Sequence, residues 1–213
     1  MSWSLNELEA LARKAARGRG MTWGMAEETG RATRALCGWG MDAPSALAKL
    51  LQLQDGLAHD AVAPARTAGP WRATGGALCP IAAGCCLNDF ATMLRSGPIH
   101  MHSVAQPLLL LGFVQMAARR LGQPVRLTIG AVQFCVTGDD IAVEGDLPDL
   151  PDQSDVTAAL ADAPFGTALI RHSRADVSDG AAAILTAFAH RTYAPATEAS
   201  RLAGAGAGLS DND

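Results

Sequence analysis

The sequence has few aromatic residues, and its basic residues do not cluster. It contains four Trp, one Tyr and five Phe, and its formal net charge is -4. Adjacent basic residues occur as isolated pairs such as Arg119-Arg120. Proteins that bind nucleic acids carry a basic surface, and those that bind single strands add aromatic side chains on which bases stack. The composition therefore argues against a nucleic-acid partner.

The sequence also lacks a hydrophobic run long enough to cross a lipid bilayer. The longest apolar stretch, 104–118, is interrupted by two glutamines and a proline, whereas a spanning helix needs about 20 predominantly apolar residues. Glu7 and Glu9 occupy the region where a secretory signal would have its apolar core. We therefore expect no membrane contact and a cytoplasmic protein.

The five cysteines follow no spacing typical of a disulfide framework, and the sequence has no C-x-x-C motif. An odd number of irregularly spaced cysteines is typical of proteins in a reducing compartment. Cysteine usage thus agrees with a cytoplasmic location. The sequence does not identify a cofactor.

The first 54 residues have the pattern of three amphipathic helices. Ser4 and Glu7 have the spacing of a capping box before the first helix. A second helix is predicted over 22–37, and Asp42 is placed to cap a third. Glycines follow the first two helical segments, and we expect Gly18 and Gly20 to end the first one. These helices form a small helical unit.

The rest of the chain mixes helical and alternating patterns. At 213 residues, 49% hydrophobic and 18% charged, it is globular and of ordinary domain size. We predict these segments: a connector over 56–76 anchored by Trp71, a central helix after Pro80, a helix over 104–121, three strands at 125–129, 132–136 and 141–143, an acidic loop over 146–155, a strand over 167–172 and a helix from about Ser178.

These segments predict an α+β fold with an N-terminal helical unit (1–54) and an α+β core (55–198). The core contains central helices, a small antiparallel meander and a C-terminal strand and helix, and we expect it to form one domain with the helical unit. A flexible, glycine-rich, acidic tail follows over 199–213.

The segment 75–94 carries glycines, three cysteines and an Asn-Asp pair in apolar surroundings. Cys79 lies near the predicted helix N-terminus, where the pKa of a thiol is lowered, which makes it a candidate nucleophile. Asp89 is a candidate base on the same helix. The alternatives are that the cysteines only pack between helices and that Asp89 faces solvent.

His100 and His102 form an H-x-H pair. In an extended strand both side chains point to the same side, so they are candidate ligands of one metal ion. Two ligands are fewer than a metal site needs. The alternative is that both are surface or capping histidines.

The tail contains a G-x-G-x-G pattern at Gly204, Gly206 and Gly208, preceded by Ser200 and Arg201. Successive glycine N–H groups can turn toward an anion, with Arg201 supplying positive charge. We therefore treat these residues as candidate ligand-binding residues. The alternative is a flexible terminus, because a dinucleotide fingerprint must follow a strand and open a helix.

Several motifs resemble a family of uncharacterised proteobacterial proteins of about this length, known only as a domain of unknown function. They are the opening Ser4-Leu-Asn-Glu7, the central Leu78-Cys79-Pro80-Ile81, and the ending from Ser200-Arg201 through Gly204-Ala-Gly-Ala-Gly208 to Asp211-Asn-Asp213. The resemblance implies a bacterial, cytoplasmic protein and assigns no activity. The helical pattern of 5–53 is similar also to the N-terminal helices of the malate/L-lactate dehydrogenase family that lacks the Rossmann fold, whose long remaining chain has no counterpart here.

Two functions are compatible with these features. The first is a small-molecule catabolic enzyme for a carboxylate or amino-acid-like substrate, with Cys79 or Asp89 as nucleophile or base and Arg201 holding the substrate carboxylate. The second is a non-catalytic accessory or ligand-binding subunit that docks a partner enzyme through its tail. The expected partners are accordingly a small-molecule ligand, a second copy of the chain or a partner enzyme.

Overall fold

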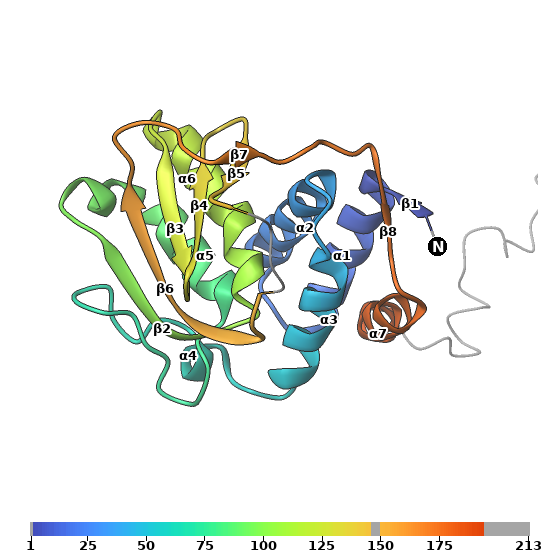
Figure 1. The fold of residues 1–213 in the computed structure, drawn as a ribbon. Helices are drawn as coiled ribbons and strands as arrows, with labels where there is room; N and C mark the ends of the chain where they lie inside the picture. Colours follow the sequence, from blue (N-terminus) through green and yellow to red (C-terminus); the bar gives the residue numbers. More distant parts are fainter. Residues whose placement is uncertain (1, 146–149, 194–213) are drawn as a thin grey trace, which may run out of the picture.

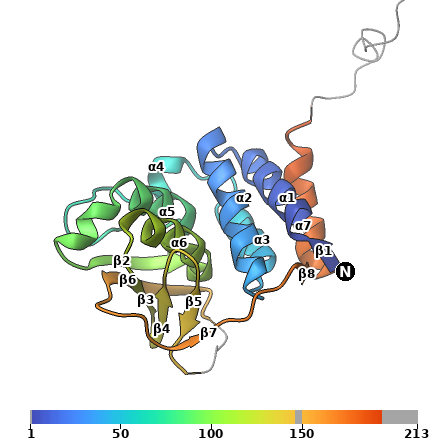
Figure 2. The same ribbon diagram turned by 90° about the horizontal axis from the view of Figure 1, so that it is seen from above.

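A helical layer and a six-stranded sheet form the two sides of the molecule, with two helices between them (Figures 1 and 2). The computed structural model describes residues 2–145 and 150–193. The helical layer consists of α1 (Leu5–Arg19), α2 (Trp23–Gly38), α3 (Ala43–Leu53) and α7 (Asp179–His190). The helices next to the sheet are α5 (Pro80–Asp89) and α6 (Leu110–Leu121). The predicted α+β class is confirmed.

The N-terminal helices begin where their polar caps predict. Ser4, Thr22 and Asp42 are the N-caps of α1, α2 and α3, and each side chain accepts a hydrogen bond from a backbone N–H three residues later. The capping box of Ser4 and Glu7 is complete, because Glu7 also accepts the N–H of Ser4 at 2.8 Å. These caps satisfy backbone donors that would otherwise have no partner within the helix.

Helix α7 joins the N-terminal helices into one layer by packing against α1 and α3. Gly18 is the contact point, since a Cβ there would lie 1.7 Å from the carbonyl oxygen of Phe188. The prediction that Gly18 ends α1 is therefore wrong. The helix continues to Arg19 and ends at Gly20, whose φ of 103° is in the left-handed region.

The main sheet is antiparallel throughout, in the order β2-β6-β3-β4-β5-β7. A separate two-stranded sheet joins β1 (Ser2–Ser4) to β8 (Arg174–Asp176). The strands of the main sheet are β2 (Ile99–Ala105), β3 (Val125–Ile129), β4 (Val132–Val136), β5 (Ile141–Val143), β6 (Gln153–Leu160) and β7 (Thr167–Ala168). The predicted meander is confirmed as β3, β4 and β5.

Strand β6 is the second strand of this sheet, between the edge strand β2 and β3, where the sequence predicted an acidic loop reaching residue 155. The prediction is wrong for 153–155. The alternation in β6 is weak, because only Val156 and Ala158 are fully buried within the strand. The predicted strand over 167–172 is also shorter than expected, since β7 ends at Ala168.

Helix α6 begins six residues later than the predicted helix over 104–121. Val104 and Ala105 still belong to β2, and a 3-10 turn, η2 (Pro107–Leu109), precedes α6. Pro107 explains the change, because proline disfavours the helical conformation in the residue before it, and Gln106 has a φ of 43°. No helix within residues 2–145 and 150–193 is long and apolar enough to cross a membrane.

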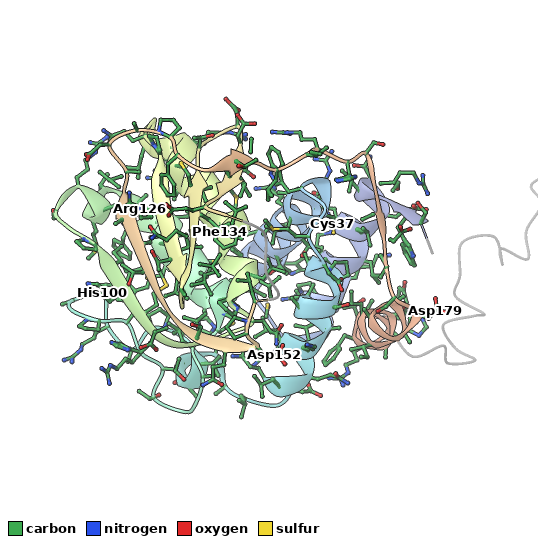
Figure 3. The ribbon with its side chains drawn as sticks, viewed as in Figure 1. Cys37, His100, Arg126, Phe134, Asp152 and Asp179 are labelled. Atoms are coloured by element: carbon green, nitrogen blue, oxygen red, sulfur yellow. The ribbon has the colours of Figure 1, made fainter. Side chains whose placement is uncertain are left out.

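The inner face of the sheet covers α5 and α6, and the outer face is polar. Phe134 is fully buried on the inner side, whereas His100 is exposed on the outer side at the far edge of the sheet (Figure 3). The connector before α5 contains the short helix α4 (His59–Val62), and a 3-10 turn, η1 (Ala91–Arg95), follows α5.

Trp71 anchors the connector, as predicted, and is fully buried. Its backbone N–H donates to the carbonyl of His100 at 2.8 Å, and its carbonyl accepts the N–H of His102 at 3.0 Å. The connector thus covers the exposed edge of β2, which protects that edge from pairing with another chain.

Two glycines allow α6 to pack closely on its neighbours. A Cβ on Gly84 of α5 would lie 2.3 Å from the ring of Phe113, and a Cβ on Gly112 of α6 would lie 2.7 Å from the Cβ of Ala32 on α2. Real Cβ atoms do not approach other heavy atoms so closely. Gly112 therefore sets the distance between α6 and α2 of the helical layer, and Gly84 sets the distance between α5 and α6.

We expect Gly84→Ala to lower the free energy of unfolding by about 1–3 kcal/mol, because the buried ring of Phe113 has to move. Gly24→Ala is the matched control, since a Cβ on this exposed helical glycine meets nothing within 4 Å. Alanine there should raise the stability by up to about 1 kcal/mol. Urea unfolding of the two variants measures both effects, and equal stabilities would contradict the close contact.

Candidate functional site

Cys79, the predicted nucleophile, is the N-cap of α5 and is buried. Burial raises the pKa of its thiol, because the charged thiolate loses solvation. Backbone N–H groups of Ile81 and Ala82 at the helix start act in the opposite direction but are the smaller effect. The helix N-terminus predicted from sequence is present, but burial outweighs it, so the structure does not support an activated Cys79.

The space beside Cys79 is small. It is a cavity of about 40 Å³ that Arg19, Gln54 and His59 also line. The Nε of Arg19 and the Oε1 of Gln54 are buried without a hydrogen-bond partner. A cavity of this size with unsatisfied polar atoms suits a bound water molecule and not an organic substrate.

The other cysteines with perturbed pKa values are shifted in the same direction. Burial raises the pKa of Cys37 to about 12, with a further contribution from the Asp42 carboxylate. Burial also raises the pKa of Cys85, and the neighbouring carboxyl of Glu28 adds to it. Burial and then the charge of Asp89 raise the pKa of Cys86.

Asp89 lies at the opposite end of α5 from Cys79 and is exposed. At about 1.5 Å per helical residue, the two residues are roughly 15 Å apart along the helix. They therefore do not act on the same atom of one small substrate. Catalytic roles for Cys79 and Asp89 stay predictions, and the structure does not bring the two together.

His100 and His102 both lie on the outer face of β2, on the same side as predicted. Nδ1 of His100 is 3.1 Å from Oγ1 of Thr157, and Nδ1 of His102 is 3.0 Å from Oδ2 of Asp155. Each histidine thus binds its own partner on β6. Within residues 2–145 and 150–193, no group of three or more His, Cys, Asp or Glu side chains is placed to hold a metal ion.

The candidate ligand residues of the tail, Ser200, Arg201, Gly204, Gly206 and Gly208, lie outside the described residues. Their proposed anion site stays a prediction, and so does the division of the chain at residues 54 and 198.

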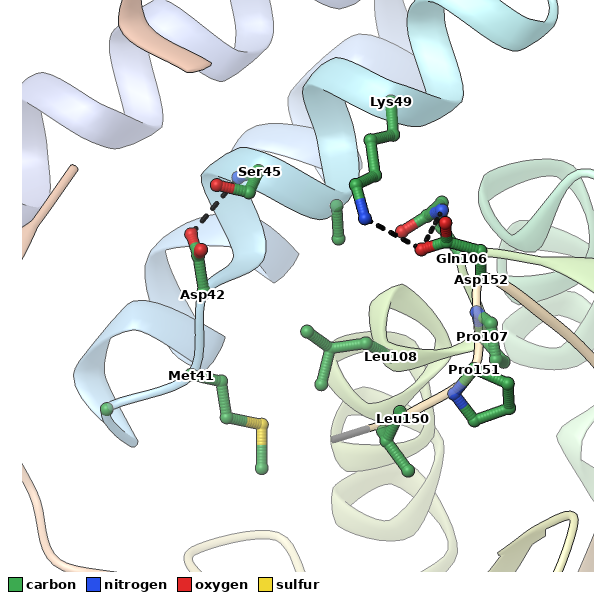
Figure 4. A pocket seen from close by; sticks show the side chains of 12 residues that line it. Met41, Asp42, Ser45, Lys49, Gln106, Pro107, Leu108, Leu150, Pro151 and Asp152 are labelled. Atoms are coloured by element: carbon green, nitrogen blue, oxygen red, sulfur yellow. Dashed lines mark hydrogen bonds and ion pairs between the residues drawn. The ribbon is translucent and has the colours of Figure 1, made fainter. Parts of the chain in front are cut away.

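The structure contains a larger pocket that the sequence did not predict (Figure 4). It has a volume of about 480 Å³ and lies between α3, the β2–α6 connection and the segment before β6. We call it the Lys49 pocket and define it by its lining residues: Gly40, Met41, Asp42, Ser45, Ala46, Lys49, Gln106, Pro107, Leu108, Leu150, Pro151 and Asp152. Figure 3 places Asp152 at the boundary between the sheet and the helical layer.

Three polar side chains meet at one end of the Lys49 pocket. The Nζ of Lys49 is 2.8 Å from Oδ1 of Asp152, and the same oxygen accepts a hydrogen bond from Nε2 of Gln106 at 3.0 Å. These hydrogen bonds, that of Lys49 first, hold the pKa of Asp152 below its usual range. Asp152 is therefore a carboxylate at neutral pH.

Gln106 fixes the position of Asp152 through the backbone as well. Its N–H donates to the carbonyl of Asp152 at 2.6 Å. Its φ of 43° is unusual for a residue with a side chain, and such strained residues concentrate at functional sites. The Gln-Pro dipeptide was the one sequence signal for this turn, whereas nothing local to Lys49 or Asp152 indicated that they meet.

The opposite wall of the Lys49 pocket is apolar. Met41, Leu108 and Leu150 project into it, as Figure 4 shows. At the far end, Oδ1 of Asp42 accepts the N–H of Ser45 at 3.2 Å and caps α3. The pocket thus combines an apolar wall, one ammonium group and two carboxylates, a composition suited to a small polar organic molecule.

Comparison with known protein families finds a domain of unknown function over part of the chain, as the sequence motifs predicted. Residues 3–79 match the family "Protein of unknown function (DUF3726)". The match extends from β1 to the start of α5, and it includes the α3 side of the Lys49 pocket but not Gln106 or Asp152. No curated protein and no solved structure matches the chain. DUF3726 assigns no activity, and the bacterial source stays a prediction.

Cys79 should be alkylated about tenfold or more slowly in the folded protein than in the urea-unfolded protein at pH 8. Its raised pKa reduces the thiolate fraction, and burial blocks access. Mass spectrometry of peptides after timed iodoacetamide treatment measures this ratio. Equally fast labelling in both states would restore Cys79 as a candidate nucleophile.

The side-chain carboxyl of Asp152 should titrate below its usual pKa in the folded protein, and Lys49→Met should move the value up. Because the folded-state pKa is lowered, the Lys49–Asp152 pair stabilises the fold above the unfolded pKa of about 3.9, and this contribution is lost as the pH falls through the folded value. Carboxyl-detected NMR titration measures both pKa values. Identical values in the two proteins would contradict the pairing.

Proposed function

We propose that the protein binds a small amino-acid-like molecule in the Lys49 pocket. The observation that carries the proposal is the ion pair of Lys49 and Asp152 at the end of a cavity with an apolar opposite wall. Pockets for small molecules have volumes of about 300–1,000 Å³ and place a few polar groups among apolar side chains. The Lys49 pocket, at about 480 Å³, has this size and composition.

The opposite charges of the pair favour a ligand that carries both signs. In the free protein Lys49 and Asp152 neutralise each other across 2.8 Å. A molecule with neighbouring ammonium and carboxylate groups offers each of them a new charged partner, with the ammonium on Asp152 and the carboxylate on Lys49. Charge-assisted hydrogen bonds of this kind are about twice as strong as neutral ones.

The other lining residues of the Lys49 pocket suit the side chain of an amino-acid-like ligand. Met41, Leu108 and Leu150 are placed to contact an apolar side chain. Gln106 holds the carboxylate of Asp152 in place before the ligand arrives, because it donates to this residue through both its side chain and its backbone. Such preorganisation reduces the entropy that binding costs.

Binding, and not catalysis, is what this geometry supports best. Cys79 and Asp89 do not line the Lys49 pocket. This agrees with the ligand-binding alternative drawn from the sequence, whereas turnover of a carboxylate or amino-acid-like substrate stays a hypothesis.

A thermal-shift screen of the common free amino acids should find at least one that raises Tm, because a ligand that binds only the folded state stabilises it. Each amino acid is compared with the amine that lacks its carboxylate and the acid that lacks its ammonium group. For the best ligand, calorimetry on Lys49→Met and on Asp152→Asn should show affinity reduced about tenfold or more, equivalent to about 1.4 kcal/mol.

Arg13→Met and Glu27→Gln are the matched controls. Arg13 and Glu27 form an ion pair of 3.1 Å between α1 and α2 that does not line the pocket. These variants should bind the ligand as the parent protein does. The proposal fails if no amino acid raises Tm, or if the Lys49 and Asp152 variants bind as tightly as the controls.

A further inference from the structure

A second cavity, of about 380 Å³, lies between α2, α6 and the segment that joins β7 to β8. It shares no lining residue with the Lys49 pocket. The α2–α3 turn contributes to both cavities, since Gly38 and Trp39 line this one and Gly40 and Met41 line the other.

Four arginines line this second cavity, which we call the arginine cavity. Arg31 and Arg34 come from α2, Arg119 comes from α6, and Arg171 comes from the β7–β8 connection. None of its described lining residues is an aspartate or a glutamate. Three separate segments of the chain therefore bring like charges to one hollow.

The carboxylates around the arginine cavity do not balance these charges. Arg34 is 3.4 Å from Glu9, and Arg119 is 3.6 Å from Asp139, both in solvent-exposed pairs. Within residues 2–145 and 150–193, the side chain of Arg31 has no ion-pair or hydrogen-bond partner. Exposed ion pairs of this length are weak, so an incoming anion can replace them. Arg119 and Arg171 also donate to the backbone carbonyls of Gly138 and Asp139, and an anion would bind their remaining N–H groups.

Two further features of the cavity, the stacking of Arg171 on Trp39 and the side chain of Gln115, also point to a ligand. The guanidinium of Arg171 stacks on the ring of Trp39, 4.2 Å from its centroid, which orients its N–H groups. Gln115 on α6 is only 8% exposed and lines the cavity. Its side-chain amide has no hydrogen-bond partner in the described part of the chain, and its polar atoms are not among the fully buried ones, so the amide is free to bond a molecule in the cavity.

Helix geometry explains one of the four positions. Arg119 lies in the last turn of α6, where the helix dipole favours positive charge, whereas Arg31 and Arg34 lie before the last turn of α2. Arg171 is held in the connecting segment by its contact with Trp39 and by a hydrogen bond to the backbone carbonyl of Asp139. Four like charges around one cavity repel one another, and an anion between them removes that cost.

We propose that the arginine cavity binds a compact multivalent anion, either a phosphate-bearing or a polycarboxylate small molecule. Guanidinium groups bind both classes through paired N–H···O hydrogen bonds. The amide of Gln115 supplies a further donor to an anionic oxygen. The site is separate from the Lys49 pocket and does not depend on the function proposed for it.

Calorimetry with pyrophosphate and with citrate at low ionic strength tests the proposal. At least one of the two anions should bind, and Arg31→Met should weaken binding about tenfold or more. Gln115→Leu should also weaken it, and added salt should reduce the affinity. Arg95→Met is the matched control, because this exposed arginine of η1 does not line the cavity. Lys49→Met should leave the binding of both anions unchanged.

The relative affinities for the two anions identify the class of ligand. Tighter binding of pyrophosphate assigns the site to phosphate-bearing ligands, and tighter binding of citrate assigns it to polycarboxylates. Circular dichroism confirms that each variant is folded before its affinity is compared. The proposal is overturned if neither anion binds, or if Arg95→Met weakens binding as much as Arg31→Met.

Discussion

The close contact of α6 with α2 and α5 is the constraint on which the rest of the structure depends. Gly112 lies against Ala32, and Gly84 lies against Phe113, at distances that leave no room for a Cβ. The first contact fixes the distance between α6 and the helical layer, and the second fixes the distance between α5 and α6. The Lys49 pocket and the arginine cavity both lie at this boundary, before and beside α6, and Gly112 itself lines the arginine cavity.

Features determined by neighbouring residues could be predicted from the sequence. The N-terminal helices begin at Ser4, Thr22 and Asp42 because a short polar side chain satisfies a backbone donor three residues away. The meander was predictable because its strands alternate apolar and polar residues across short turns. Both kinds of signal are contained within a few consecutive residues.

Features that depend on distant contacts could not be predicted. Lys49 and Asp152 are separated by 103 positions, and their pairing depends on a strand, β6, whose own alternation is weak. The same holds for the arginine cavity, where Arg171 joins α2 and α6 from beyond the sheet. Cys79 shows the converse case, since its place at a helix start was predictable but its burial, which raises its pKa, was not.

The most direct test of the central claim, that the Lys49 pocket binds a small zwitterion, is NMR mapping with the common free amino acids added to isotope-labelled protein. The proposed site predicts amide shifts concentrated around Met41 to Lys49, Gln106 to Leu108 and Leu150 to Asp152, and none at the arginine cavity. Shifts confined to other surfaces, or no shifts with any amino acid at millimolar concentration, would contradict it.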